Sequence, residues 1–335
     1  MLDSPLPADP AQVHEAAKWK HDRPLTGCRF DPTGKFVFTG AEDYFITRWD
    51  LNDGKPTKLA GHESWARAIA FSADGQTLVT GGYDGKLIWW PATAEKPEPI
   101  RKIDAHTGWV RALAVSPDGK LLASVGNDLR LKLWELADGK SVRELSGHAS
   151  HIYNVVFHPS APAIATCDLK GVVKHWDLSS DKPLREVTAT ALHKYDNTFR
   201  ADIGGARSIG FSADGKFLAL GGMTNCTNAF AGIGHAAIGV IDWEKATVAR
   251  LHTAKENVNG TAWGIRWHSD GFWVGLSGGG GGGFFYFWKP DSEKEFFKFK
   301  LPETGRDMDM ASDGLRLAVA HADGFLRIYK MAKKA

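Results

Sequence analysis

The chain has 335 residues, of which 43% are hydrophobic and 24% charged, so it can bury a sizeable core and is not globally disordered. Its formal net charge of +2 argues against a dedicated nucleic-acid-binding protein, because such proteins concentrate basic charge. No apolar run reaches the roughly 18 residues of a membrane helix, residues 1–20 show no secretory signal, and the three distant cysteines fit a reducing, cytoplasmic compartment.

A short apolar segment that ends in a tight turn recurs along the chain. It is clearest at 68–75, 112–119 and 208–215, where each copy ends in Asp-Gly. Two further short segments follow in most units, and the last of the three segments ends in an aromatic residue. The aromatic residues of successive units are typically 41 to 45 residues apart. These aromatic residues are Trp49, Trp90, Trp134, Trp176, Trp288 and Tyr329. A period of roughly 40 residues with about four short strands per unit predicts the blades of a β-propeller.

These units resemble WD40 repeats over roughly residues 12–331. Gly-His pairs occur at 61–62 and 147–148, and Trp-Asp pairs occur at 49–50 and 176–177. The resemblance implies an all-β fold of seven blades, each with four antiparallel strands, and seven units can be counted. They begin near residues 21, 62, 106, 148, 203, 258 and 302. We therefore interpret residues 1–335 as a single domain.

The two ends of the chain are expected to meet in the last blade. Unit seven ends with its third strand at 325–329, whereas residues 12–20 lie where other units carry a fourth strand. We expect the segment 13–19 to pair with 325–329 and close the ring, and the WD40 resemblance implies a similar closure. Closure would remove two exposed strand edges, which otherwise invite aggregation.

Three units share a histidine, a serine or threonine, an aspartate and a tryptophan at matching positions. The sets are His21, Thr39, Asp43 and Trp49; His62, Thr80, Asp84 and Trp90; and His106, Ser124, Asp128 and Trp134. The resemblance implies a buried chain of hydrogen bonds, in which a hydroxyl satisfies the indole N–H. Catalysis by a serine–histidine–aspartate group would not need three copies, so no catalytic residue, metal or cofactor is expected. Unit four carries Lys170 at the aspartate position, which predicts an incomplete set and a looser blade.

Departures from the repeat length fall on one end of the propeller, here called the top face, where the turns after second and fourth strands lie. They are residues 192–206, residues 223–235 and the glycine run 278–283, which we interpret as loops. Long loops on a rigid scaffold carry binding residues, although neutral insertion is the alternative interpretation.

A group of arginines and aromatic residues is expected around the top mouth of the central channel, because most of them begin the innermost strands. The group comprises Trp65, Arg67, Tyr83, Trp109, Arg111, Tyr153, Arg207, Trp263 and Arg306. Arginine, tryptophan and tyrosine dominate interface hot spots, and four guanidinium groups favour an acidic or phosphorylated peptide. Glu42, Asp307 and Asp309 reduce this positive charge. The alternative is that the tryptophans anchor loops and the arginines stack on them.

The sequence thus predicts a non-catalytic scaffold, monomeric by itself, that binds a protein or peptide partner on the top face. Neither a membrane nor a nucleic acid is an expected partner, although the arginines leave nucleic-acid binding as a third hypothesis. The competing hypothesis is an enzyme, or a small-ligand or metal site, built from the long loops of unit five. His193, Tyr195, Asp196 and His235 would supply its chemistry.

Overall fold

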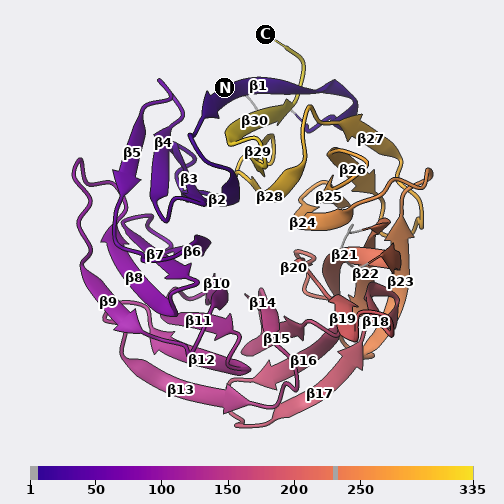
Figure 1. Ribbon diagram of the computed structural model, residues 1–335, viewed down its shortest axis with the longest axis horizontal. Helices are drawn as coiled ribbons and strands as arrows, with labels where there is room; N and C mark the ends of the chain where they lie inside the picture. The colour runs from indigo at the N-terminus through magenta and orange to yellow at the C-terminus, as the bar shows by residue number, and fades with distance from the viewer. Residues whose placement is uncertain (1–6, 229–232, 335) are drawn as a thin grey trace.

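The computed structural model describes residues 7–228 and 233–334, and these form seven four-stranded antiparallel sheets around a central channel (Figure 1). The predicted seven-bladed β-propeller is confirmed. The innermost strands of blades 1 to 7 are β2 (Leu25–Phe30), β6 (Ala66–Phe71), β10 (Val110–Val115), β14 (Ile152–Phe157), β20 (Ser208–Phe211), β24 (Thr261–His268) and β28 (Gly305–Met310). The second strands are β3 (Phe36–Ala41), β7 (Thr77–Gly82), β11 (Leu121–Gly126), β15 (Ala163–Asp168), β21 (Phe217–Asn228), β25 (Phe272–Gly278) and β29 (Arg316–His321).

The outer half of each blade completes the sheet. The third strands are β4 (Ile46–Asp50), β8 (Lys86–Pro91), β12 (Arg130–Glu135), β16 (Val172–Asp177), β22 (Ile233–Asp242), β26 (Phe284–Trp288) and β30 (Phe325–Met331). The fourth strands are β5 (Pro56–Leu59), β9 (Arg101–Asp104), β13 (Ser141–Ser146), β17 (Pro183–Thr188), β23 (Thr247–Thr253), β27 (Phe297–Lys300) and β1 (Val13–Lys20). Two short 3-10 turns, η1 (Pro10–Gln12) and η2 (Thr190–Leu192), precede β1 and follow β17. No helix in the described part of the chain is long and apolar enough to span a membrane.

The hydrophobic core lies between neighbouring blades. One cluster, for example, joins Leu133 of blade 3 to Val155 and Trp176 of blade 4. Second strands are buried on both faces, as in β15, whereas the outer strand β17 alternates between half-buried and exposed residues. This difference explains why second strands read as continuous apolar runs and outer strands as alternating ones.

The chain ends close the ring as predicted. Strand β1 pairs antiparallel with β30, from Val13 opposite Met331 to Lys20 opposite Phe325. The Lys20 ammonium donates to the carbonyl of Asp323 and lies 4.5 Å from the Phe325 ring. In Figure 1 the indigo β1 lies beside the yellow β30, so the last blade is built from both ends of the chain.

The polar sets form hydrogen-bond chains inside the blades. In blade 2 the Trp90 indole N–H donates to Thr80 Oγ1 (2.9 Å), and His62 lies between Thr80 (Nε2, 2.8 Å) and Asp84 (Nδ1, 2.9 Å). Because a carboxylate only accepts, Nδ1 carries the proton and Nε2 accepts from the hydroxyl. Blade 3 repeats this chain with His106, Ser124, Asp128 and Trp134. Blade 1 differs, because His21 contacts Asp43 through Nε2 (3.0 Å) and Thr39 pairs with Trp49 alone.

The prediction of an incomplete set in blade 4 was wrong. His148 Nδ1 lies 2.8 Å from Asp168, Nε2 lies 2.7 Å from Thr166 Oγ1, and the Trp176 indole also donates to that hydroxyl. Asp168 follows Thr166 by two residues and therefore points to the same face of β15. In blade 2 the corresponding position is Gly82, where a Cβ would meet Asp84 Oδ1 at 2.4 Å. Either position can thus deliver a carboxylate to the same place.

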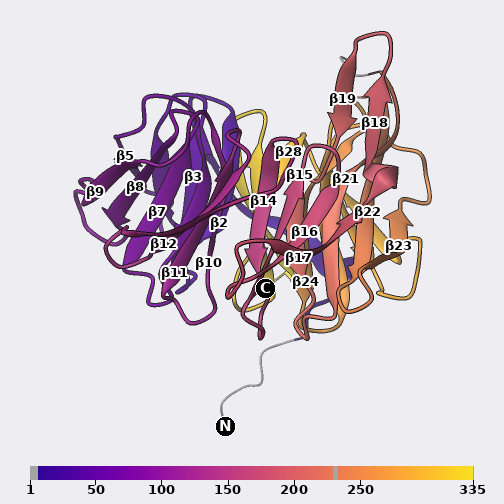
Figure 2. The same ribbon diagram turned by 90° about the horizontal axis from the view of Figure 1, so that it is seen from below.

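The top-face insertions are more ordered than loops. Residues 192–206 contain a separate hairpin, β18 (His193–Asp196) and β19 (Ala201–Gly204), which projects beyond the blades in Figure 2. The predicted loop 223–235 is mostly strand, because the β21–β22 ladder continues into it, with Thr224 opposite His235. Residues 229–232 of this segment lie outside the described residues. The glycine run makes a turn, in which the N–H of Gly281 bonds to the carbonyl of Asn259 at 2.9 Å.

Deleting residues 1–20 is expected to lower Tm by about 10 °C or more and to promote aggregation, because β30 loses its partner and becomes an exposed edge. Thermal unfolding and light scattering measure both effects. A synthetic peptide spanning residues 9–20 should restore Tm when added in excess. An unchanged Tm in the truncated, monomeric protein would contradict the role of β1.

Thr80→Val is expected to lower the free energy of unfolding by about 2–5 kcal/mol, because it leaves both Trp90 Nε1 and His62 Nε2 buried without their partner. Urea denaturation provides the measurement. Thr80→Ser keeps the hydroxyl and should cost only about 1 kcal/mol. Equal losses in the two variants would show that the hydroxyl has no special role.

Candidate binding site at the channel mouth

Five of the nine residues predicted around the channel mouth stand at irregularities of the innermost strands. In six blades the ladder between the first and second strands skips one residue near its top end. The skipped residues are Thr26, Arg67, Arg111, Tyr153, Trp263 and Arg306. In blade 5, Arg207 directly precedes β20, and its N–H bonds to the carbonyl of Gly221. A β-bulge leaves one residue unpaired and redirects its side chain, so the bulges place these groups around the mouth.

A cavity of about 300 Å³ opens from this mouth into the channel. Five of the nine predicted residues line it: Arg67, Tyr83, Arg111, Tyr153 and Arg207. Below them the wall of blades 2 to 5 is formed by small or apolar residues, including Ala68, Ala112, Ala114, Val156 and Gly210, which leave space next to the guanidinium groups. The volume is at the lower end of the range for ligand pockets.

The guanidinium groups and aromatic rings alternate around the mouth. The Arg111 guanidinium carbon lies 4.5 Å from the Trp109 ring centroid and 4.6 Å from that of Tyr153. Arg207 continues the series, 4.7 Å from Tyr153 and 5.7 Å from Trp263. Arg67 reaches the same Trp263 ring at 5.7 Å, although blades 2 and 6 are not neighbours. These contacts hold the cations in place without neutralising them.

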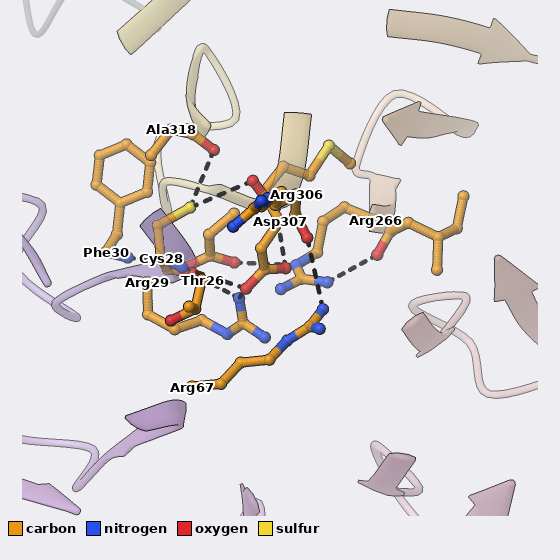
Figure 3. A network of polar contacts seen from close by, with 12 residues as sticks. Thr26, Cys28, Arg29, Phe30, Arg67, Arg266, Arg306, Asp307 and Ala318 are labelled. Atoms are coloured by element: carbon orange, nitrogen blue, oxygen red, sulfur yellow. Dashed lines mark hydrogen bonds and ion pairs between the residues drawn. The ribbon is translucent and has the colours of Figure 1, made fainter. Parts of the chain in front are cut away.

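Nearby carboxylates are engaged by other arginines. Asp307 Oδ2 accepts from Arg29 Nη1 at 2.7 Å, and Asp309 Oδ1 accepts from Arg266 Nε at 2.9 Å. Figure 3 shows Arg29 and Arg266 on opposite sides of Asp307, with Arg67 extending beneath them. Asp307 also accepts from the backbone N–H of Cys28. Burial lowers the pKa of Arg29, but Asp307 and Asp309 outweigh it, so the pKa is raised above its usual value.

Three of the four predicted arginines at the mouth, here called the ring arginines, have no carboxylate partner that neutralises their charge. Arg306 pairs with Glu42 at 2.6 Å, but no ion pair joins Arg67, Arg111 or Arg207 to a carboxylate within residues 7–228 and 233–334. Their polar contacts are neutral: Arg67 donates to the carbonyl of Arg306, and Arg111 Nε donates to Asn127 Oδ1 at 2.7 Å. Burial lowers the pKa of Arg111, and the positive charges of Arg207 and Arg67 lower it further, so Arg111 is repelled by both of these neighbours.

Four predicted residues lie outside the cavity lining. Trp65 and Trp109 sit on the rim of blades 2 and 3, where Tyr83 lies between them: the Trp65–Tyr83 ring centroids are 6.1 Å apart, and Tyr83 stacks parallel to Trp109 at 4.0 Å. We call these three residues the aromatic ledge. Trp263 holds Arg67 and Arg207, and its indole N–H donates to the carbonyl of Gly278, while Arg306 is neutralised.

Sequence reasoning missed Arg29 and Arg266, which line the cavity from blades 1 and 6. The predicted residues stand four or six positions before the apolar end of an innermost strand or, for Tyr83, directly after the second strand β7. The position one residue before that end would have revealed both arginines and, in blade 7, Asp309.

The blade 5 residues proposed for an enzyme or metal site do not come together in one place. His193 Nε2 lies 2.8 Å from Asp202 across the β18–β19 hairpin, and Asp196 accepts from the backbone N–H of Thr198 at its turn. Tyr195 is exposed. His193 and His235 line two different hollows, and the described residues contain no group of three or more side chains able to hold a metal ion.

Comparisons with known proteins agree with this architecture. The WD40 family model, described as "WD domain, G-beta repeat", matches residues 16–50, 55–91, 97–135 and 139–177. The chain is similar to "Nuclear distribution protein PAC1" of Arthroderma benhamiae, with 32% identity over 25% of this chain and 19% of the relative. It is also similar to "Small ribosomal subunit protein RACK1y" of Oryza sativa subsp. japonica, with 34% identity over 22% of each chain.

A weaker similarity, 29% identity over 25% of this chain and 10% of the relative, links it to "Protein HIR1" of Yarrowia lipolytica. The matched regions thus span about a fifth or less of the length of these relatives. The family matches cover blades 1 to 4, and blades 5 to 7 repeat the same four-stranded architecture. The chain is therefore a seven-bladed β-propeller that carries four WD40 repeats.

Proposed function

We propose that this protein is a non-catalytic interaction scaffold that binds an anionic segment of a protein partner at the top mouth of its channel. The observation that carries this proposal is the unneutralised charge of Arg67, Arg111 and Arg207 beside an open cavity. Cations held close together without a carboxylate are costly for the isolated protein. An acidic or phosphorylated side chain would remove that cost by accepting charge-assisted hydrogen bonds.

The relatives support the scaffold role in general terms. The rice relative is named as a protein of the small ribosomal subunit, and the fungal relative as a nuclear distribution protein. The first of these names describes membership of an assembly, and neither name describes chemistry on a substrate. The three buried, free cysteines support the cytoplasmic, reducing location proposed for the protein. A ring closed by its own chain also supports a monomeric scaffold.

The proposed partner is a protein segment rather than a nucleic acid. The three arginines without a carboxylate partner meet at one cavity, whereas nucleic-acid binding needs a track of cations along a backbone. The cavity matches one or two side chains in volume, and its wall in blades 2 to 5 includes small and apolar residues. A peptide that places a single anionic side chain between the three arginines satisfies both features.

Combining Arg67→Ala with Arg111→Ala is expected to weaken partner capture about ten-fold or more, because two of three cations that contact the anion are lost. Affinity capture from native lysate with quantitative mass spectrometry measures the effect, and capture by the wild type should fall as salt rises. The matched control combines Arg130→Ala with Lys140→Ala on the outer part of blade 3 and should capture normally. Undiminished, salt-independent capture by the Arg67/Arg111 variant would refute the proposal.

Removing a ring arginine should cost little stability, whereas removing a paired carboxylate should cost more. Arg207→Gln is expected to change the free energy of unfolding by no more than about 1 kcal/mol, since lost cation–π contacts are offset by relief of repulsion. Asp307→Asn should lower it by about 2–4 kcal/mol, because Arg29 loses its partner in the channel. Urea denaturation distinguishes the two. Equal losses would assign Arg207 a structural role.

A further inference from the structure

The aromatic ledge is exposed in a way that the fold does not require. Trp65 and Trp109 are 39% and 40% exposed. The backbone carbonyl of each residue accepts a hydrogen bond from the next turn. Trp65 accepts from the N–H of Tyr83 at 2.8 Å, and Trp109 accepts from the N–H of Asn127 at 3.0 Å. The same backbone bond is made at Pro24 in blade 1 and His151 in blade 4. Tryptophan is therefore unnecessary for the bond and occurs only in two adjacent blades.

Arg111 and Tyr83 connect the ledge to the cavity. Arg111 contacts the Trp109 ring at 4.5 Å and the Tyr83 ring at 5.6 Å on one side, and Tyr153 at 4.6 Å on the other. Tyr83 belongs to both groups, because it also lines the cavity. A segment whose anionic side chain reaches Arg111 therefore lies within reach of the ledge.

The chemistry of the ledge favours an apolar occupant. Tyr83 and Trp109 stack on each other at 4.0 Å with an interplanar angle of 1°, so their facing surfaces are already used and no slot remains for a flat ring between them. A cationic occupant, such as a methylated lysine, would be repelled by Arg111 and Arg67. What remains exposed is apolar ring surface, rigid and preorganised, of the kind that forms interface hot spots.

We propose that the aromatic ledge is a second subsite, which binds an apolar side chain of the same segment whose anionic side chain enters the cavity. The recognised motif is thus bipartite, with one acidic or phosphorylated residue and one apolar residue a few positions away. This inference rests on the proposed function, because the anion fixes the segment over Arg111.

The test begins with a displayed library of random peptides selected on the wild-type protein. Peptides that carry Asp or Glu together with an apolar residue at a preferred spacing are expected to be enriched. Fluorescence anisotropy then measures Kd for a labelled selected peptide. Replacing its apolar residue by alanine should weaken binding to the wild type about ten-fold, a measurement that requires no variant of the protein.

Protein variants complete the cycle. Trp65→Ala with Trp109→Ala should weaken the parent peptide about ten-fold, and the alanine-substituted peptide should bind this variant and the wild type equally. Trp65→Phe with Trp109→Phe should recover most of the affinity. Leu184→Ala, at an exposed apolar position of β17, is the matched control and should bind normally. Circular dichroism and Tm verify that each variant is folded.

Two negative outcomes are distinguishable. If salt-sensitive acidic peptides are selected but neither the tryptophan variant nor the peptide alanine changes Kd, the ledge is not a subsite and the proposed function stands. If no salt-sensitive peptide is selected, the proposed function fails, and the ledge proposal fails with it. Ledge-dependent binding of a single-stranded oligonucleotide in preference to every peptide would likewise overturn both.

Discussion

The pairing of β1 with β30 is the contact on which the rest of the structure depends. Each blade buries its apolar residues against the next, so no blade has a complete core alone. An open ring would leave two blades with uncovered faces and two strands with unpaired edges. Closing it with the chain's own first strand couples the stability of all seven sheets. The same rigidity allows side chains from blades 2, 5 and 6 to meet across the mouth at fixed distances.

The candidate site at the channel mouth is built largely from local exceptions to the regular ladder. A strand that paired without interruption would direct alternate residues into the blade packing. The bulges release one residue in each of six blades, and in blades 2 and 3 these residues are Arg67 and Arg111. The fold thus places uncompensated cations where few backbone bonds are at stake. Lower in the channel, where the ladder is regular, Arg29 and Arg266 are paired with carboxylates.

Much of the fold could be predicted from the sequence, because the repeated unit, its turns and its aromatic positions are local patterns. The closing strand was predictable from what unit seven lacked. Features that depend on three-dimensional equivalence were not. In blade 4 the carboxylate of Asp168 contacts the histidine as an aspartate at position 170 would have done. The two sequence positions differ, but their side chains can reach the same histidine. The β18–β19 hairpin has no repeat against which its pairing could be recognised.

The candidate site was predicted in part for the same reason. Aligning the units identified the residue at each bulge without revealing that a bulge was there. The partners of each charge could not be predicted, since Arg29 and Asp307 are 278 residues apart and meet only when the ring closes. The charge balance at the mouth is therefore a property of the closed ring.

Three features occur once each among the described residues, in a ring of near-identical units. They are the hairpin above blade 5, the ledge on blades 2 and 3, and the Glu42–Arg306 pair between blades 1 and 7. A featureless sevenfold ring would offer a ligand as many equivalent orientations as it has blades. These three landmarks remove that rotational degeneracy. A segment bound as proposed would consequently have one preferred orientation across the mouth, set by these three features rather than by the symmetry of the scaffold.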